Sequence, residues 1–320
     1  MKHIGFIGLG NVGSKLAGSL LRNGFEVTVH DLSPTAVGAL TANGAHVADS
    51  PRALAQAVDM VITCLPSPAI SAAVMEAEDG VLAGLKPGTV WAEMSTTDAT
   101  EVERLGALVI AKGGQPIDCP VSGGCHRAAT GNIAIFAGCE RAAFDAALPV
   151  LAAMGRRILH TGDVGTASVL KVVTNYLASA NLISVCEALV TSERAGMDMA
   201  TAYEAIRISS GNSFVHETES QVILNGSRDI NFTMDLVQKD LGLFQGVAER
   251  AGVTLEVAPL LSQIFADGVA RYGDRAWSPS IIRRLEDATG AEVRAPGFPA
   301  EMVDDEPESP GGEVVPKRAP

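Results

Sequence analysis

The pattern G-x-G-x-x-G near the start of the chain is the feature that most restricts its fold. It spans residues 8–13, between an apolar segment at His3–Gly8 and a run at Ser14–Arg22 that we expect to be helical. A second short segment, Glu26–His30, has the composition of a strand and leads to Asp31. The order strand, glycine-rich turn, helix, strand and acidic residue is typical of a dinucleotide-binding βαβ unit.

The residues of this turn have distinct physical roles in such a unit. Gly8 permits a tight turn, Gly10 lets the backbone approach a pyrophosphate, and Gly13 lets the helix pack closely on the strand. The first N–H groups of the helix can bind phosphate. We therefore expect the cofactor to contact Gly8, Leu9, Gly10, Asn11, Val12 and Gly13.

Asp31 indicates which dinucleotide is preferred. Its carboxylate can accept hydrogen bonds from the hydroxyls of an adenosine ribose, whereas it would repel a 2′-phosphate. The next positions, 32–35, contain no arginine that could compensate for that repulsion. The sequence therefore favours NAD, with NADP less favoured. Capping of the following helix is an alternative or additional role for Asp31.

Composition and charge exclude several classes of partner and site. The net charge of −13 argues against nucleic acid and anionic membrane surfaces as partners. The five cysteines are scattered without C-x-x-C spacing, which indicates reduced thiols and no metal site. No signal peptide and no uncharged apolar run of membrane-spanning length stands out. We expect a cytoplasmic protein, long enough at 320 residues for two domains.

Strands and helices alternate up to about residue 163, which predicts a dinucleotide-binding domain at 1–163. Val58–Cys64 and Thr89–Met94 are apolar enough to be buried strands. Ligands of open parallel sheets bind beyond the carboxyl ends of the strands, so the residues after these two should line the cofactor site. Those residues are Leu65, Pro66 and Thr96. Capping of the next helix is the alternative role for Thr96.

A second candidate binding element follows the strand expected at Ile117–Pro120. The turn Val121–Gly124 ends in the paired glycines Gly123 and Gly124, whose N–H groups can bind a carboxylate without any side-chain charge. A plain turn is the alternative. Strands at 132–137 and 157–160, with a helix at 141–154 between them, complete the first domain.

A long helix is predicted at Gly165–Arg194, because apolar residues recur there at helical spacing. On it, Lys171 and Asn175 lie one turn apart on the same face, where an ammonium and an amide can hold one oxygen-bearing group. A solvated pair is the alternative. Further helical segments extend to about residue 289, so 164–290 forms an all-helical second domain. Its apolar helices favour a homodimer or homotetramer.

The composition changes again at the C-terminus. Residues 291–320 are rich in proline, glycine and acidic side chains. A segment of this kind buries too little apolar surface to order itself. We therefore predict a tail that is disordered from about residue 304 and has no chemical role.

Four motifs in order give the chain a resemblance to a known family. They are Gly8–Gly13, Asp118–Gly124, Gly162–Asn175 and Lys239–Gly242. Together they resemble the β-hydroxyacid dehydrogenases, the group that contains 3-hydroxyisobutyrate dehydrogenase and tartronate semialdehyde reductase. The resemblance extends from Met1 to about residue 289. It implies a Rossmann-type doubly wound α/β domain, a long interdomain helix and a helical C-terminal domain.

The resemblance also implies an activity and residue roles. The activity is reversible hydride transfer between NAD(P) and the hydroxyl carbon of a small β-hydroxy acid. Lys171 would be the general acid/base, in a partly buried site that lowers its pKa, and Asn175 would hold the substrate and orient Lys171. The remaining implied contacts are Ser122, Gly123 and Gly124 on the substrate carboxylate, Lys239 reaching the cofactor, and Phe232 near the nicotinamide.

The chain departs from the family pattern at several positions. Ala167 replaces a glycine of the catalytic motif, and Thr174 stands where many members have asparagine. Arg127 occupies a position that is usually glycine, directly after His126. We hypothesise that Arg127 or His126 selects a more polar or more anionic substrate than hydroxyisobutyrate. The alternative is that Arg127 pairs with a surface carboxylate.

Other functions remain possible at this point. The same site could serve a reductase of tartronate or sulfolactate semialdehyde. Imine reductases share the architecture but typically lack the catalytic lysine, and 6-phosphogluconate dehydrogenase is longer and prefers NADP. A non-catalytic dinucleotide-binding module would use the same fold, since fold alone does not determine function. The combination of Lys171, Asn175, Ser122 and Lys239 favours an enzyme.

Overall fold

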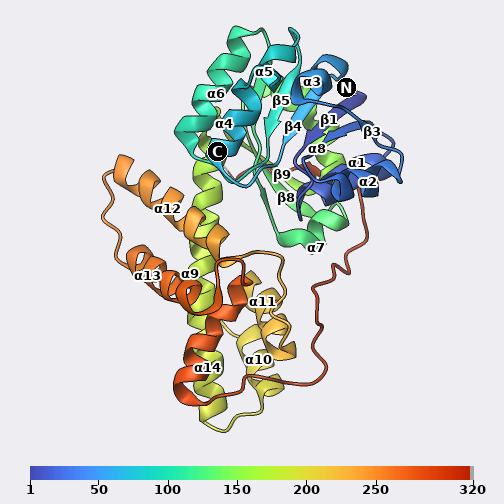
Figure 1. Ribbon diagram of the computed structural model, residues 1–320. Coiled ribbons are helices and arrows are strands. Elements are labelled where there is room, and N and C mark those ends of the chain that lie inside the picture. The colour runs from blue at the N-terminus through green and yellow to red at the C-terminus, as the bar shows by residue number, and fades with distance from the viewer. Residues whose placement is uncertain (318–320) are drawn as a thin grey trace. The chain divides into compact units, whose positions relative to one another are not determined.

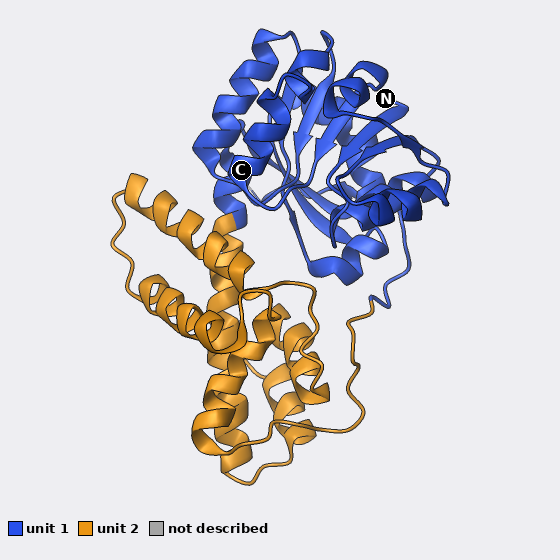
Figure 2. Ribbon diagram, viewed as in Figure 1, with its two compact units in different colours: residues 1–171, 304–320 blue, residues 172–303 orange. Residues whose placement is uncertain are grey.

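The computed structural model describes residues 1–317 and divides into two compact units (Figures 1 and 2). Unit 1 contains Met1–Lys171 and the C-terminal segment from Asp304, and unit 2 contains Val172–Val303. The predicted α/β domain, long helix and helical C-terminal domain are all present. The division lies inside the long helix rather than at residue 163, because the first turn of that helix is buried within unit 1.

The strands of unit 1 form one sheet. Within residues 1–317 its order is β10-β9-β8-β6-β5-β4-β1-β2-β3, with β7 paired to β8. Neighbours are parallel except for the antiparallel pairs that β8 makes with β6 and β7. The strands are β1 (His3–Ile7), β2 (Glu26–His30), β3 (His46–Val47), β4 (Met60–Thr63), β5 (Val90–Glu93), β6 (Gln115–Asp118), β7 (Val121–Ser122), β8 (Ile133–Gly138), β9 (Gly155–Gly162) and β10 (Gly312–Glu313).

The helices of unit 1 include three that begin with a Ser-Pro pair. The hydroxyls of Ser33, Ser50 and Ser67 each accept a hydrogen bond from the N–H three residues later. The proline that follows each serine needs no partner at the first helical position, so the pair is a local start signal. The helices are α1 (Gly13–Arg22), α2 (Pro34–Thr41), α3 (Pro51–Ala57), α4 (Pro68–Glu76), α5 (Val81–Gly84), α6 (Ala99–Ala111), α7 (Gly124–Ala129) and α8 (Arg141–Met154).

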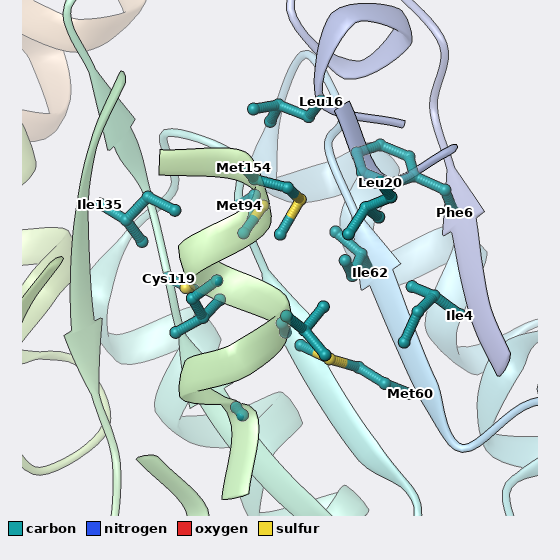
Figure 3. Close-up of a cluster of buried hydrophobic side chains, with 14 of the residues drawn as sticks. Ile4, Phe6, Leu16, Leu20, Met60, Ile62, Met94, Cys119, Ile135 and Met154 are labelled. Carbon is teal, nitrogen blue, oxygen red and sulfur yellow. The ribbon is translucent and has the colours of Figure 1, made fainter. Parts of the chain in front are cut away.

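A buried hydrophobic cluster packs α1 against β1 and the neighbouring strands of the sheet (Figure 3). Ile4 and Phe6 of β1 pack there with Leu16 and Leu20 of α1, and all four side chains are fully buried. Burying a side chain of this kind stabilises the fold by about 1.5–3 kcal/mol. The turn that joins β1 to α1 is therefore held at both ends by packed side chains.

Unit 2 is helical. Its helices are the remainder of α9 (Thr166–Arg194), with α10 (Met199–Arg207), α11 (Phe214–Asn225), α12 (Met234–Arg250), α13 (Val257–Tyr272), the 3-10 helix η1 (Ser278–Ile282) and α14 (Arg283–Thr289). By length and composition alone α9 could cross a membrane. Its side chains Leu182 and Leu189 pack into the core of unit 2, and core helices of soluble proteins pass the same test.

The C-terminal segment differs from the prediction of a disordered tail. Residues 312–313 form β10, which extends the sheet beside β9, and Val314 N–H donates to Ile158 O at 2.8 Å. Glu313 pairs with Arg141 at 2.7 Å. Main-chain hydrogen bonds and ion pairs hold this segment, and a composition rule that counts apolar surface does not detect them. Residues 318–320 lie outside the described part.

Candidate active site

The glycine-rich turn is tightly packed against the protein on one side and open on the other. Gly8 has φ +95°, and a Cβ there would lie 2.3 Å from Cys64 O. A Cβ on Gly13 would lie 2.0 Å from Gly8 O. A Cβ on the exposed Gly10 would meet no heavy atom within 4 Å. The open space beside Gly10 is where the pattern predicts a pyrophosphate.

Helix α1 begins at this turn, and its N-terminus can bind an anion. The N-cap residue is Val12, whose side chain makes no capping hydrogen bond. The first N–H groups of a helix attract negative charge, and a phosphate can satisfy them in place of a capping side chain. The turn and helix therefore fit the pyrophosphate of a dinucleotide.

Asp31 lies beside the same turn. Its Oδ2 accepts a hydrogen bond from Leu9 N–H at 2.6 Å, and its Oδ1 accepts one from Ser33 N–H at 2.7 Å. Ser33, not Asp31, caps α2. The carboxylate thus joins the end of β2 to the glycine-rich turn, the position from which an acidic residue contacts an adenosine ribose.

The predicted contacts Leu65, Pro66 and Thr96 follow the adjacent parallel strands β4 and β5. Leu65 N–H donates to Ser95 Oγ at 2.7 Å, so the two strand ends are joined. The alternative capping role of Thr96 is taken by Asp98, which accepts from Thr100 N–H at 2.8 Å.

A buried carboxyl group that the sequence analysis did not single out supports these strand ends. Glu93 is 1% exposed and accepts hydrogen bonds from Ser95, whose N–H lies 2.9 Å from Glu93 Oε1. Burial raises the pKa of Glu93, and the hydrogen bonds from Ser95 oppose that shift. The only signal for Glu93 in the sequence is an acidic residue at the end of an apolar strand, two residues before Ser95.

The two glycines of the predicted carboxylate-binding turn adopt backbone conformations that other residues rarely adopt. Ser122 ends β7, and Gly123 and Gly124 follow with φ +128° and +86°, which favours glycine at both positions. A Cβ on Gly123 would lie 3.3 Å from Cδ of Arg127, and one on Gly124 would lie 2.9 Å from Cε1 of His126. The two basic side chains of α7 therefore lie directly against the two glycines.

Lys171 lies in the second turn of α9, and the first turn is anchored to the sheet. Asp118, fully buried at the end of β6, accepts hydrogen bonds from the N–H and hydroxyl of Ser168 at 2.7 and 2.6 Å. Burial raises the pKa of Asp118 to about 6, although hydrogen bonds from Ser168 oppose the shift. Lys171 follows Ser168 by three residues and is 8% exposed. The sheet thereby determines where this buried amine lies.

The remaining predicted residues belong to unit 2, where a buried carboxylate joins two of them. Asn175 donates from Nδ2 to Oδ2 of Asp240 at 2.5 Å, and Lys239 Nζ lies 2.8 Å from Asp240 Oδ1. Asp240 is 2% exposed. The sequence analysis quoted Asp240 within a motif but gave it no role. Phe232 packs against the core of unit 2.

Neither a metal cluster nor Cys119 offers an alternative reactive site within the described residues. No group of three or more His, Cys, Asp or Glu within residues 1–317 could hold a metal ion. Cys119 is fully buried, and burial raises the pKa of its thiol well above the usual value. A thiol of this kind is a poor nucleophile.

Comparisons with known proteins identify the family of this chain. Residues 3–162 match the NAD-binding domain of 6-phosphogluconate dehydrogenase, and residues 165–285 match the NAD-binding region of NADP-dependent 3-hydroxyisobutyrate dehydrogenase. The 2-(hydroxymethyl)glutarate dehydrogenase of Eubacterium barkeri is 36% identical over 291 residues, which cover 91% of this chain and 97% of that protein. The chain belongs to the β-hydroxyacid dehydrogenase family.

Two further family members show how far the similarity extends. The NAD-dependent L-serine dehydrogenase of Pseudomonas aeruginosa is 34% identical to this chain. The match covers 90% of this chain and 99% of the Pseudomonas enzyme. A crystal structure of 3-hydroxyisobutyrate dehydrogenase from Salmonella typhimurium superposes with a TM-score of 0.82 at 29% identity, covering 89% of this chain and all of that one. The protein is thus an NAD(P)-dependent oxidoreductase that acts on a small β-hydroxy acid.

Proposed function

We propose that this dehydrogenase reversibly oxidises the hydroxyl of a small β-hydroxy acid to a semialdehyde, with NAD preferred and Lys171 as the general acid/base. The observation that supports the proposal most is the placement of Lys171. It is a buried amine, one helical turn from Asn175, on a helix whose first turn is anchored to β6 by Asp118. A buried, positioned lysine suits proton transfer at neutral pH.

Each residue has a defined part in this reaction. NAD supplies the hydride acceptor. The hydroxyl of Ser122 and the N–H groups of Gly123 and Gly124 bind the substrate carboxylate. Lys171 Nζ accepts the proton of the reacting hydroxyl during oxidation and returns a proton to the same oxygen during reduction. Asn175, whose amide is held by Asp240, orients the substrate hydroxyl.

The preference for NAD rests on Asp31, and Asp31→Asn tests it. The substitution keeps an acceptor for Leu9 N–H but removes the charge that repels a 2′-phosphate. We expect the ratio of kcat/KM for NAD to that for NADP to fall by about 10- to 100-fold, because a hydrogen bond to a charged group contributes about 1.5–3 kcal/mol. Steady-state kinetics with both cofactors measures the ratio. The exposed Asp145→Asn is the control. An unchanged ratio would assign the preference to another residue.

The substrate itself is identified by a panel assay. The panel contains 3-hydroxyisobutyrate, 3-hydroxypropionate, glycerate, L-serine, 2-(hydroxymethyl)glutarate and a hydroxy sulfonate, each with NAD and NADP. The matching semialdehydes with NADH test the reverse direction. We expect NAD-dependent turnover of at least one compound by the wild type and none by Lys171→Ala. Tight NAD binding without turnover in either direction would instead support a non-catalytic dinucleotide-binding module.

A further inference from the structure

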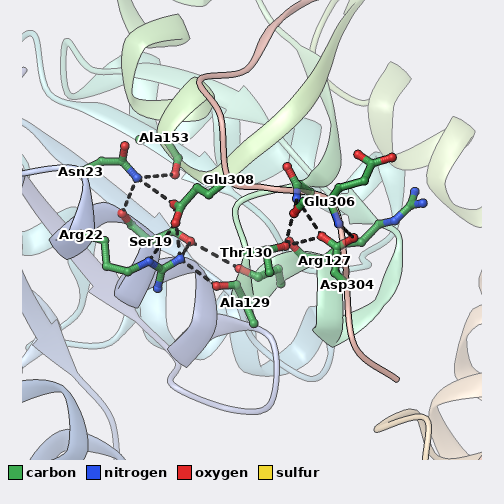
Figure 4. A network of polar contacts seen from close by, with 12 residues as sticks. Ser19, Arg22, Asn23, Arg127, Ala129, Thr130, Ala153, Asp304, Glu306 and Glu308 are labelled. Carbon is green, nitrogen blue, oxygen red and sulfur yellow. Dashed lines mark hydrogen bonds and ion pairs between the residues drawn. The ribbon is translucent and has the colours of Figure 1, made fainter. Parts of the chain in front are cut away.

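The C-terminal segment that follows unit 2 contacts the end of α7, the short helix that begins at the proposed substrate loop, residues 122–124. The family models end at residue 285, and the relatives are matched over 97–99% of their own length but only about nine-tenths of this chain. The segment from Asp304 to Glu308 therefore lies beyond the region that the family models describe. Figure 4 shows it beside the ends of α1 and α7. We call residues 304–317 the C-terminal extension.

Asp304 is the residue of the extension that lies at the end of α7. Its Oδ2 accepts hydrogen bonds from Thr130 Oγ1 and from Nδ2 of the buried Asn132, the latter at 2.7 Å. Thr130 directly follows α7, and its hydroxyl lies 3.2 Å from Arg127 O. A carboxylate at the C-terminal end of a helix is unfavourable on its own. Hydrogen bonds and a nearby cation can balance it.

The last turn of α7 supplies that cation. Burial raises the pKa of Asp304, but the hydrogen bonds from Thr130 and Asn132 and the charge of Arg127 together hold it below its usual range. Burial and the charge of Arg127 lower the pKa of His126, so the permanent positive charge of this turn is that of Arg127. The charge of Arg127 thus acts on the carboxylate of Asp304, and its stem lies against Gly123. The role of Arg127 in substrate selection stays a prediction.

Separate contacts hold the extension in place after Asp304. Glu308 pairs with Arg22 at 3.1 Å and accepts a hydrogen bond from Asn23 at 3.1 Å. Arg22 also donates to Ala129 O at 2.7 Å, which joins α1 to the end of α7. Further along, β10 pairs with β9. Because of these anchors, removing the charge of Asp304 should leave the extension bound.

We propose that Asp304, which the C-terminal extension holds at the end of α7, is a specificity-determining residue. Its carboxylate balances the charge of Arg127 beside Gly123. This weakens the attraction for a second anionic group on the substrate and favours hydroxy acids that have a single carboxylate. The proposal rests on the proposed function, in which Ser122, Gly123 and Gly124 bind the substrate carboxylate.

The test compares one monocarboxylate with one dicarboxylate. We measure kcat/KM for 3-hydroxyisobutyrate and 2-(hydroxymethyl)glutarate, and in parallel the Kd of butyrate and glutarate for the NAD complex by calorimetry. Asp304→Asn should shift both ratios about tenfold toward the dicarboxylate, because Arg127 loses its counter-charge. Arg127→Ala should shift them the opposite way. Glu308→Gln, which weakens an anchor distant from Arg127 along the extension, should leave both ratios unchanged.

The outcomes separate the two levels of the proposal. Unchanged ratios in Asp304→Asn, with turnover still dependent on Lys171, would overturn the role of Asp304 and leave the proposed function intact. Equal shifts in Asp304→Asn and Glu308→Gln would also overturn it, because the extension would then act only by holding α7. If no hydroxy acid is turned over, the proposed function fails, and the Kd ratio of glutarate to butyrate still decides the role of Asp304.

Discussion

Replacement of Lys171 by alanine should lower kcat/KM for the hydroxy acid by about 10²- to 10⁴-fold, the usual effect of losing a general acid/base. The side chain is buried in α9, outside the glycine-rich turn and away from Asp31 in the sequence. NAD binding should therefore persist. Lys171→Arg should be almost equally inactive, because a guanidinium keeps its proton at any pH at which the protein is folded.

The measurement combines steady-state kinetics in both directions with calorimetric titration of NAD. Lys112→Ala, at an exposed position after α6, is the matched control and should behave like the wild type. If Lys171→Ala kept more than about a tenth of the wild-type kcat, another group would have to move the proton. A catalytic role for Lys171 would then be wrong, whichever acid is the substrate.

Replacement of Asp118 by alanine should have the next largest effect. It leaves the N–H and hydroxyl of Ser168 without their acceptor, and each buried unsatisfied group costs about 1–3 kcal/mol. The first turn of α9 should then shift, and a small misplacement of Lys171 lowers kcat by about 10- to 100-fold. We expect the affinity for NAD to change little and Asp118→Asn to recover part of kcat. Equal losses in NAD affinity and kcat would indicate general misfolding instead.

The buried carboxyl group of Asp118 also predicts how stability depends on pH. Its pKa of about 6 lies above the ordinary 3.8, so the folded protein favours the protonated carboxyl group. The stabilisation that results is fully present below about pH 4 and is lost as the pH rises through 6. The difference corresponds to about 3 kcal/mol. Urea unfolding at pH 4.5 and pH 7 should show the wild type losing stability relative to Asp118→Asn as the pH rises. A constant difference between the two proteins would contradict this pKa.

Local patterns in the sequence determined the fold class. The glycine-rich turn, the alternation of strands and helices, and the long helix at 166–194 all follow from short-range spacing and propensity. The predicted strands of unit 1 are present, with ends within two residues of those expected. The helices α2, α3 and α4 were expected from the alternation but given no bounds, although each begins with a Ser-Pro pair that serves as a local start signal.

The tertiary structure alone determined which carboxylates support the candidate site. Asp118 contacts Ser168 across 50 residues, Asp240 contacts Asn175 across 65, and Asp304 contacts Thr130 across 174. No periodicity or motif spacing encodes such pairs, because they form only when separate strands and helices pack together. The ordered C-terminal extension was missed for the same reason. Its stability comes from pairing with β9 and from ion pairs to distant arginines, and neither is visible in its own composition.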